Sequence, residues 1–144
     1  MLVSDLIRRK GSSVASAPPD TTVAALLDLL AEHRIGAVVV SADGRTVAGI
    51  ISERDVVRAL RTRGSALLDA PISEVMTADV VVAAPGDTLE DLMRTMTERR
   101  IRHVPVVVGA TMAGIISIGD VVASRIDELE ADRDQLIDYI QSSG

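Results

Sequence analysis

The sequence predicts an α/β (α+β) fold built from two copies of one β-α-β-β-α unit. A decapeptide occurs twice, as AGIISERDVV at residues 48–57 and AGIISIGDVV at residues 113–122, and eight of its ten letters match. Upstream of each copy, residues 19–40 and 85–106 share Pro, Thr, Glu, Arg, Ile and Val at a constant offset of 66. Short β-branched runs alternate with segments of helical apolar spacing in both halves, which indicates strands and helices in the same order.

In the first half, local composition defines each element. Thr21 or Thr22 can cap a helix whose apolar residues recur at helical spacing, and the β-branched runs that follow predict buried strands. An Asp-Gly pair at residues 43–44 predicts a hairpin between two of these strands. The expected elements are a strand at 14–17, a helix to His33, strands at 37–40 and 47–51, and a helix that begins at Ser52.

The second half repeats this order. The expected elements are a strand at 80–82, a helix at 88–99, strands at 103–108 and 112–116 around a Gly109-Ala110 turn, and a helix from Ser117. The segment 61–76 links the halves and carries a short helical turn at 72–76. We therefore place repeat one at residues 1–66 and repeat two at residues 67–144, packed about a pseudo-twofold axis.

The final helix extends beyond its counterpart in the first half. Its apolar residues follow a 4-3-7-4 spacing that Arg133 interrupts, as in a coiled coil. They are Val122, Ile126, Leu129, Leu136 and Ile140. Such a face must be buried, either against the helix's own domain or against a second subunit, and the sequence leaves both alternatives open.

Composition excludes several function classes. With one Tyr, no Phe or Trp and a net charge of −6, the chain lacks both the stacking platforms and the basic surface of nucleic-acid-binding proteins. With no cysteine and two histidines, His33 and His103, we expect neither a thiolate nucleophile nor a metal site. We expect no membrane span, a cytoplasmic location and no enzymatic activity, because no nucleophile, P-loop or dinucleotide motif is present.

Each decapeptide ends in Ser-x-x-Asp, at Ser52 and Asp55 and again at Ser117 and Asp120. The simpler interpretation is a pair of helix caps, because Ser and Asp at this spacing form a capping box. The alternative is a binding site, because a helix N-terminus directly after a strand attracts an anion such as phosphate. An Asp one turn into the helix is also placed to accept hydrogen bonds from a ribose diol.

These residues resemble a tandem pair of cystathionine-β-synthase (CBS) domains, the Bateman module. The resemblance is carried by residues 49–55 and 114–120, which read Gly-Ile-Ile-Ser-x-x-Asp, with support from residues 35–39 and 101–106. The resemblance covers almost the whole chain. The sequence resembles in particular small stand-alone bacterial proteins of this type.

The resemblance implies an adenosine-containing ligand, AMP, ATP or NAD, in the cleft between the two domains, with no metal. Asp55 and Asp120 are then expected to hold ribose, with Ser52 and Ser117 as hydroxyl partners. Gly36, Ala37 and Val38, and likewise Val104 and Pro105, are expected to border the adenine pockets. Thr77 and Val80 are expected to close one pocket, and Lys10, Gly11 and Val14 are their repeat-one counterparts.

The two halves are not equivalent. Repeat two carries Arg102 and His103 where repeat one has Gly36-Ala37, so we expect its pocket to be the fuller one. Arg54, Arg102 and His103, joined by Lys10, the only lysine, are candidates for contacts with phosphate. Arg54 can equally be a solvated helix residue, and His103 can equally fill a buried strand.

The predicted function is therefore that of a regulatory sensor that changes conformation on binding a nucleotide and acts in trans on an unknown protein. The alternative is a dimerisation or scaffold module with vestigial ligand sites. In either case we expect a homodimer, because CBS pairs commonly assemble in this way and the final helix offers further apolar surface.

Overall fold

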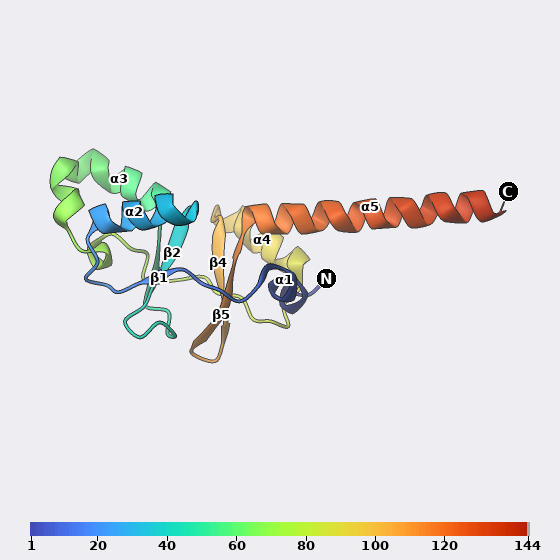
Figure 1. The fold of residues 1–144 in the computed structure, drawn as a ribbon, viewed down its shortest axis with the longest axis horizontal. Helices are drawn as coiled ribbons and strands as arrows, with labels where there is room; N and C mark the ends of the chain where they lie inside the picture. Colours follow the sequence, from blue (N-terminus) through green and yellow to red (C-terminus); the bar gives the residue numbers. More distant parts are fainter. Residues whose placement is uncertain (144) are drawn as a thin grey trace.

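The computed structural model describes residues 1–143; Gly144, the last residue of the predicted second domain, lies outside them. Two lobes stand side by side, and one long helix projects from the second (Figure 1). The first lobe contains β1 (Ser16–Ala17), α2 (Val23–His33), β2 (Ala37–Val40), β3 (Gly49–Ser52) and α3 (Glu53–Arg63). This is the predicted β-α-β-β-α order, with helix α2 capped by the Thr22 hydroxyl.

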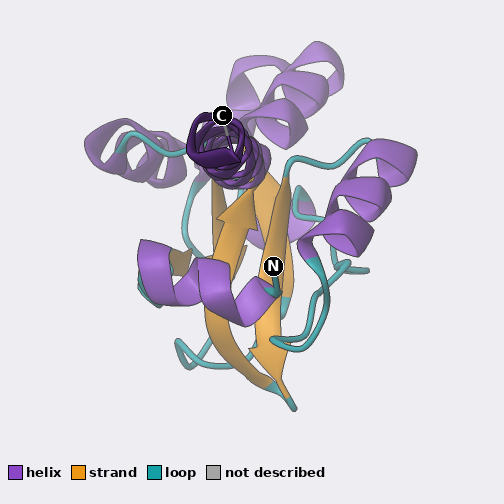
Figure 2. Cartoon of the chain, turned by 90° about the vertical axis from the view of Figure 1, so that its right-hand side faces the viewer, coloured by secondary structure: helices purple, strands orange, loops and turns teal. Residues whose placement is uncertain are grey.

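The second lobe contains α4 (Leu89–Arg99), β4 (His103–Val108), β5 (Thr111–Ser117) and α5 (Ile118–Ser143). It also contains α1 (Val3–Lys10), a helix that the sequence analysis did not predict. Two short 3-10 helices, η1 (Gly64–Asp69) and η2 (Ile72–Glu74), connect the lobes. The second of them corresponds to the helical turn predicted at residues 72–76. Figure 2 views α5 nearly end-on, with the strands of both lobes below it.

The strand predicted at residues 80–82 is wrong. In the first lobe β1 pairs in parallel with β2, where Ala17 lies opposite Val40. In the second lobe the equivalent contact is reduced to one isolated bridge between Ala83 and Val106. The preceding residues form no ladder because Val80 and Val81 turn toward the space between the lobes, which they line.

Both predicted hairpins are present, although their turns differ. Strands β4 and β5 join through the tight Gly109-Ala110 turn, in which Gly109 has φ 63°. Strands β2 and β3 are joined by the longer loop 41–48, where the Asp43 carboxylate accepts hydrogen bonds from the backbone N–H groups of Arg45 and Thr46, at 2.8 Å each. These bonds hold the pKa of Asp43 far below its ordinary value, so the ionised carboxylate stabilises the loop.

Each hydrophobic core includes residues from a segment outside the β-α-β-β-α unit of its own lobe. The core of the first lobe includes Leu67 and Ile72 from the linker, and the core of the second lobe includes Val3 and Leu6 from α1. Backbone bonds repeat this relation, since residues 70–72 bond to residues 21–23 as residues 1–3 bond to residues 87–89. A division of the chain at residue 66 remains a prediction, because each core draws on residues from both sides of it.

The glycine of each decapeptide provides room for the segment from outside the unit. A Cβ at Gly49 would lie 2.5 Å from the Met76 sulfur and 2.9 Å from the Thr77 carbonyl oxygen. A Cβ at Gly114 would lie 2.5 Å from Cδ1 of Ile7. Gly49 therefore lies against the backbone of the segment that crosses it, whereas Gly114 lies against the end of one side chain.

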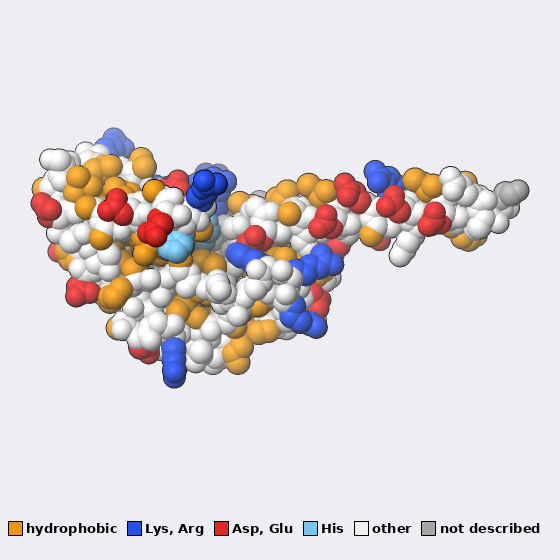
Figure 3. All heavy atoms as spheres, in the orientation of Figure 1, with side chains coloured by type: hydrophobic (Ala, Val, Ile, Leu, Met, Phe, Trp, Pro, Cys, Tyr) orange, Lys and Arg blue, Asp and Glu red, His pale blue; other side chains and the backbone are white. Residues whose placement is uncertain are grey.

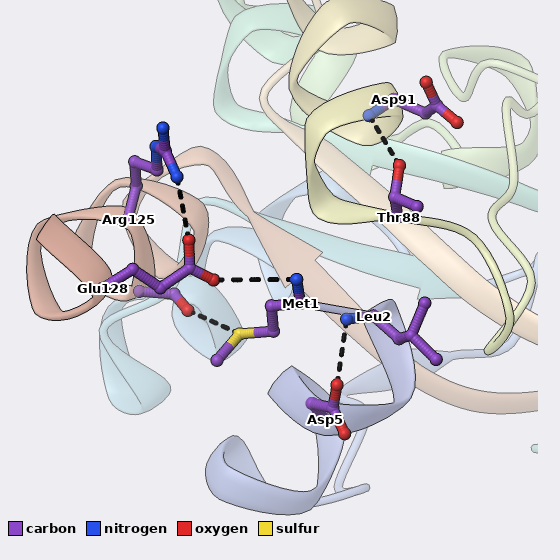
Figure 4. Close-up of polar contacts among 8 residues, drawn as sticks. Met1, Leu2, Asp5, Thr88, Asp91, Arg125 and Glu128 are labelled. Atoms are coloured by element: carbon purple, nitrogen blue, oxygen red, sulfur yellow. Dashed lines mark hydrogen bonds and ion pairs between the residues drawn. The ribbon is translucent and has the colours of Figure 1, made fainter. Parts of the chain in front are cut away.

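The base of α5 is anchored to the start of the chain. Glu128 lies 3.8 Å from the Met1 backbone nitrogen and accepts a 3.0 Å hydrogen bond from Arg125 (Figure 4). Val121 and Ser124 are buried on this side of the helix. Beyond residue 128 every described residue of α5 is exposed, so packing of the predicted stripe against its own domain is wrong. No helix among residues 1–143, α5 included, is both long enough and apolar enough to cross a membrane.

Candidate functional site

The helix that starts within each decapeptide begins at a capping box. The Ser52 hydroxyl accepts a hydrogen bond from the Asp55 N–H at 3.3 Å, and the Asp55 carboxylate accepts one from the Ser52 N–H at 2.8 Å. Ser117 and Asp120 form the same two bonds, at 3.1 and 2.8 Å. The helix-cap interpretation is confirmed in both repeats. It is compatible with ligand binding, since a carboxylate can accept about four hydrogen bonds.

A cleft of about 1190 Å³ lies between the two lobes and reaches both capped helix ends. Its walls come from the start of α3, the end of α4, the start of α5 and the segment 77–81. The cleft is large enough for a nucleotide, because small-molecule sites usually have volumes of roughly 300–1,000 Å³. Apolar contacts are available from Ile50, Val80 and Val81.

The cleft is locally basic although the chain is acidic. Five arginines line it against three carboxylates, and Figure 3 shows Lys and Arg side chains gathered where the lobes meet. This excess of positive charge attracts an anion, and guanidinium groups are suited to phosphate. The arginines are Arg54, Arg58, Arg99, Arg100 and Arg102, and the carboxylates are Glu53, Asp55 and Asp79.

Sequence reasoning missed three of these arginines. Arg58 lies four residues after Arg54, so both lie on one face of α3. Arg99 and Arg100 lie at the end of α4, directly before β4. Helical spacing was the available signal for Arg58, whereas nothing in the sequence shows that the end of α4 faces the start of α3.

Arg54 connects the two lobes. Its Nη1 donates a 3.2 Å hydrogen bond to the carbonyl oxygen of Arg100. Arg100 is the C-cap of α4, with φ 54° and ψ 44°, and a cation at a helix C-terminus is favourable. Gly119 occupies the position of Arg54 in repeat two and cannot make an equivalent link. Arg54 is therefore not merely a solvated helix residue.

The Asp120 carboxylate is already occupied by a distant cation. The Nζ of Lys10 lies 2.5 Å from Asp120 Oδ2 and 2.6 Å from the Ile115 carbonyl oxygen. Burial would by itself raise the pKa of Asp120, but the hydrogen bonds from Lys10 and Ser117 outweigh burial and hold the pKa below its ordinary value. The carboxylate that was expected to bind ribose in repeat two is thus ionised and neutralised by Lys10.

His103 is half-buried and lines the cleft. Burial lowers the pKa of its imidazole, and the positive charges of Arg102 and Lys10 lower it further, against the weaker attraction of Glu53. A Cβ at Gly36 would lie 3.3 Å from the Glu53 carboxylate and 3.4 Å from the His103 ring, so both side chains lie against that glycine. The imidazole is therefore neutral at pH 7 and lies at the junction of the lobes.

The predicted site residues fall into two groups. The residues that line the cleft are Gly36, Ser52, Arg54, Asp55, Thr77, Val80, Arg102, His103 and Ser117. The residues outside its lining are Lys10, Gly11, Val14, Ala37, Val38, Val104, Pro105 and Asp120, of which Ala37, Val38, Val104 and Pro105 are buried in the strands. Their roles in binding a ligand remain predictions.

The decapeptide strand of each repeat is contacted by a segment that precedes the other repeat in the chain. Thr77, from the linker, pairs with Ile50 of repeat one, whereas Lys10, from the start of the chain, contacts Ile115 of repeat two. Lys10 was expected to be a repeat-one residue that joins the arginines. The structure instead packs α1 in the core of the second lobe and pairs Lys10 with Asp120, and a role of Lys10 in binding phosphate remains a prediction.

The comparison with protein families agrees with this architecture. The sequence model of the CBS domain matches residues 3–62 and 72–127. The fold and the cleft define a paired-repeat module of the Bateman type, and the chain belongs to the CBS-domain family. A curated relative, the mitochondrial CBS domain-containing protein CBSX3 of Arabidopsis thaliana, is 33% identical over 147 aligned positions, which cover 96% of this chain and 71% of that protein.

Solved structures show the same fold. A CBS-domain containing protein of Agrobacterium tumefaciens is 46% identical, with a TM-score of 0.83 over 87% of this chain and 99% of that chain. A CBS domain protein of Pyrobaculum aerophilum, solved in complex with AMP, is 27% identical, with a TM-score of 0.73 over 83% of this chain and 89% of that chain. The predicted fold class is thus confirmed.

Proposed function

We propose that this chain is a regulatory module that binds an adenosine-containing nucleotide between its two CBS repeats and acts in trans on another protein. The observation that carries the proposal is a cleft that is lined by five arginines and reaches two capped helix N-termini. The similar Pyrobaculum aerophilum protein is complexed with AMP, which supports the ligand class. The role is binding without catalysis.

Within the cleft, the repeat-one end is the better ribose site. The Asp55 carboxylate lines the cleft and receives its hydrogen bonds, from the Ser52 N–H and hydroxyl, on Oδ2. Its other oxygen remains for a ribose diol. The Asp120 carboxylate is tied to Lys10 and does not line the cleft. This order is the reverse of the one that the sequence favoured, and it implies one open site per chain.

The ligand then carries more than one phosphate. Phosphates placed beyond Asp55 meet Arg54 and Arg58 on α3 and Arg99 and Arg100 on α4. Four guanidinium groups offer more bidentate donor pairs than the three terminal oxygens of one phosphate can accept, so ATP or NAD fits better than AMP.

A scaffold with vestigial sites is the alternative function. The occupation of Asp120 by Lys10 favours it, because a site filled by the protein's own side chain resembles one that has lost its ligand. On this view Asp55 is only a helix cap, and nucleotides leave the protein unaffected.

Titration with AMP, ATP and NAD separates the two functions. A ligand at 100 times its Kd stabilises the folded state by about 2.7 kcal/mol, which raises Tm by several degrees. Asp55→Asn keeps the cap geometry but removes the charge, and loss of a charge-assisted hydrogen bond of about 1.5–3 kcal/mol weakens binding roughly 10- to 150-fold. Asp120→Asn is the matched control and is expected to bind almost normally. No Tm shift with any of the three nucleotides would establish the scaffold function instead.

A further inference from the structure

The projecting part of α5 carries an apolar stripe, which we define as Val122, Ile126, Leu129, Leu136 and Ile140. Their side chains are between 47% and 60% exposed, and Figure 1 shows the helix extending away from both lobes. Residues 129–143 are exposed throughout, so the second lobe supports none of them. A helix of this length without tertiary contacts is marginal in water, which indicates that something covers the stripe.

The stripe is not an extension of the surface that anchors α5. The anchoring side of the helix carries Val121, Ser124 and Glu128, and these positions lie roughly 130° around the helix axis from the stripe. The opposite side carries Asp127, Asp134 and Asp138, which keep that side in solvent. The stripe thus faces free solvent between an anchored side and an acidic side.

We propose that the stripe binds the same stripe of a second copy of this chain, with the two α5 helices antiparallel and centred near residue 131. The positions 122, 126, 129, 133, 136 and 140 are spaced 4-3-4-3-4, which reads the same in both directions. In the antiparallel pair, Val122 of one copy lies opposite Ile140 of the other, and Ile126 lies opposite Leu136. This proposal rests on α5 alone and is independent of nucleotide binding.

Arg133 selects the direction of the pair. A parallel pair would place the two Arg133 guanidinium groups face to face inside the apolar seam, which is unfavourable. The antiparallel pair places each Arg133 beside Leu129 of the other copy and within reach of its Glu130. In the single chain, Arg133 has only the exposed contact with its neighbour Asp134, at 3.2 Å, and such contacts contribute little.

The charge of α5 argues against a membrane as the occupant. Its segment from Asp127 to Asp138 carries six carboxylates and, at Arg133, one cation. Helices that lie on membranes carry lysine and arginine on their polar side, because lipid surfaces are anionic. A second α5, whose Arg133 and Glu130 complement each other, fits this surface.

Cysteine cross-linking tests the pairing and its direction, because the chain has no natural cysteine. The variants are Ile126→Cys and Leu136→Cys, oxidised separately and as an equimolar mixture after exchange of subunits. In the antiparallel pair, residue 126 lies about 15 Å along the axis from its own copy, beyond the roughly 4.4–6.8 Å Cα separation of a disulfide. We expect the mixture to cross-link at least tenfold faster than either variant alone. Equal rates in the separate variants would establish a parallel pair and overturn the proposal, as would no cross-linking at all.

A surface variant separates helix pairing from association through the lobes. Leu136→Asp is introduced into the Ile126→Cys chain, with Asp138→Ala on the acidic side as the matched control. Leu136 is 60% exposed, so the melting temperature of the lobes is expected to stay unchanged. We expect Leu136→Asp to abolish cross-linking to a Leu136→Cys partner and Asp138→Ala to preserve it. Cross-linking that survives Leu136→Asp overturns the proposal, as does a wild-type mass of 15.2 kDa by sedimentation at millimolar concentration.

Discussion

Replacing Lys10 by alanine is expected to open a second ligand site. In the wild-type chain, Lys10 Nζ lies 2.5 Å from the Asp120 carboxylate, and the two side chains are only 29% and 25% exposed. Lys10 and the Ser117 N–H both bond Oδ2 of Asp120, so without the ammonium group Asp120 retains its capping bonds to Ser117 but loses the cation that neutralises its charge. The number of nucleotides bound per chain is expected to rise from one to two.

The same change has a cost in stability. Exposed ion pairs contribute about 0–1 kcal/mol, and the loss of one partner of a fully buried pair costs about 3–5 kcal/mol. Because the Lys10–Asp120 pair is partly buried, we expect a loss of about 1–2 kcal/mol in the free energy of unfolding. For a chain of this length, at about 2–4 °C per kcal/mol, that loss lowers Tm by roughly 2–8 °C.

The loss of stability is expected to depend on pH with a definite sign. The pKa of Asp120 is lower in the folded protein than in the unfolded chain, where it is near 3.8. The contribution of the ionised pair is therefore fully present above pH 3.8 and is lost as the pH falls through the folded pKa. The Tm difference between wild type and Lys10→Ala should persist at pH 7 and shrink in acid.

Isothermal titration calorimetry with ATP measures the stoichiometry, and a thermal melt measures the stability. Arg9→Ala is the matched control, because Arg9 is an exposed cation at the end of the same helix. A wild-type stoichiometry of two, or a stoichiometry of one in Lys10→Ala, would refute the reasoning.

The remaining predictions concern the glycines and the cleft histidine. Gly49→Ala should destabilise the fold more than Gly114→Ala in urea unfolding, because its Cβ meets the fixed Thr77 carbonyl whereas that of Gly114 meets the movable end of Ile7; equal losses would show that both sites relax. In NMR titrations, His103 should titrate below the ordinary pKa of 6.5 in the free protein and at a higher pH when ATP is bound, and a pKa unmoved by ATP would place the phosphates elsewhere. Because the folded state binds this proton less readily than the unfolded chain, the free energy of unfolding should fall as the pH drops below 6.5, and His103→Gln should flatten that dependence.

Local patterns were sufficient to predict most of the fold. The Ser52 and Ser117 caps, the β-branched strand at residues 37–40 and the Gly109-Ala110 turn each depend on neighbouring residues, and all are present. The sequence repeat also predicted that the two lobes have the same order of elements, because similar sequences adopt similar folds. Helix α1 was missed since its apolar residues, such as Leu6, are buried by the other repeat.

The candidate site was only partly predictable, because its charges come from distant segments. The sequence placed Lys10 with the arginines on the basis of charge alone, whereas the chain path brings it to Asp120, 110 residues away. Likewise, the contact of Arg54 with the carbonyl of Arg100 depends on how the lobes face each other. Such pairings follow from long-range packing, which a single sequence does not encode in any local spacing.

The asymmetry of the two sites has one physical origin. In repeat one, the Ile50 carbonyl accepts a hydrogen bond from the Thr77 backbone N–H at 2.9 Å, and in repeat two the equivalent Ile115 carbonyl accepts one from the Lys10 ammonium group. A backbone N–H satisfies the carbonyl and leaves the neighbouring Asp55 free, whereas an ammonium group has further donors and also neutralises Asp120. The two decapeptides are thus nearly identical in sequence, but only the aspartate of the second is paired with a lysine. Because the repeat-two contact comes from a side chain and the repeat-one contact from the backbone, a single substitution, Lys10→Ala, removes the first, whereas no side-chain substitution other than proline removes the second.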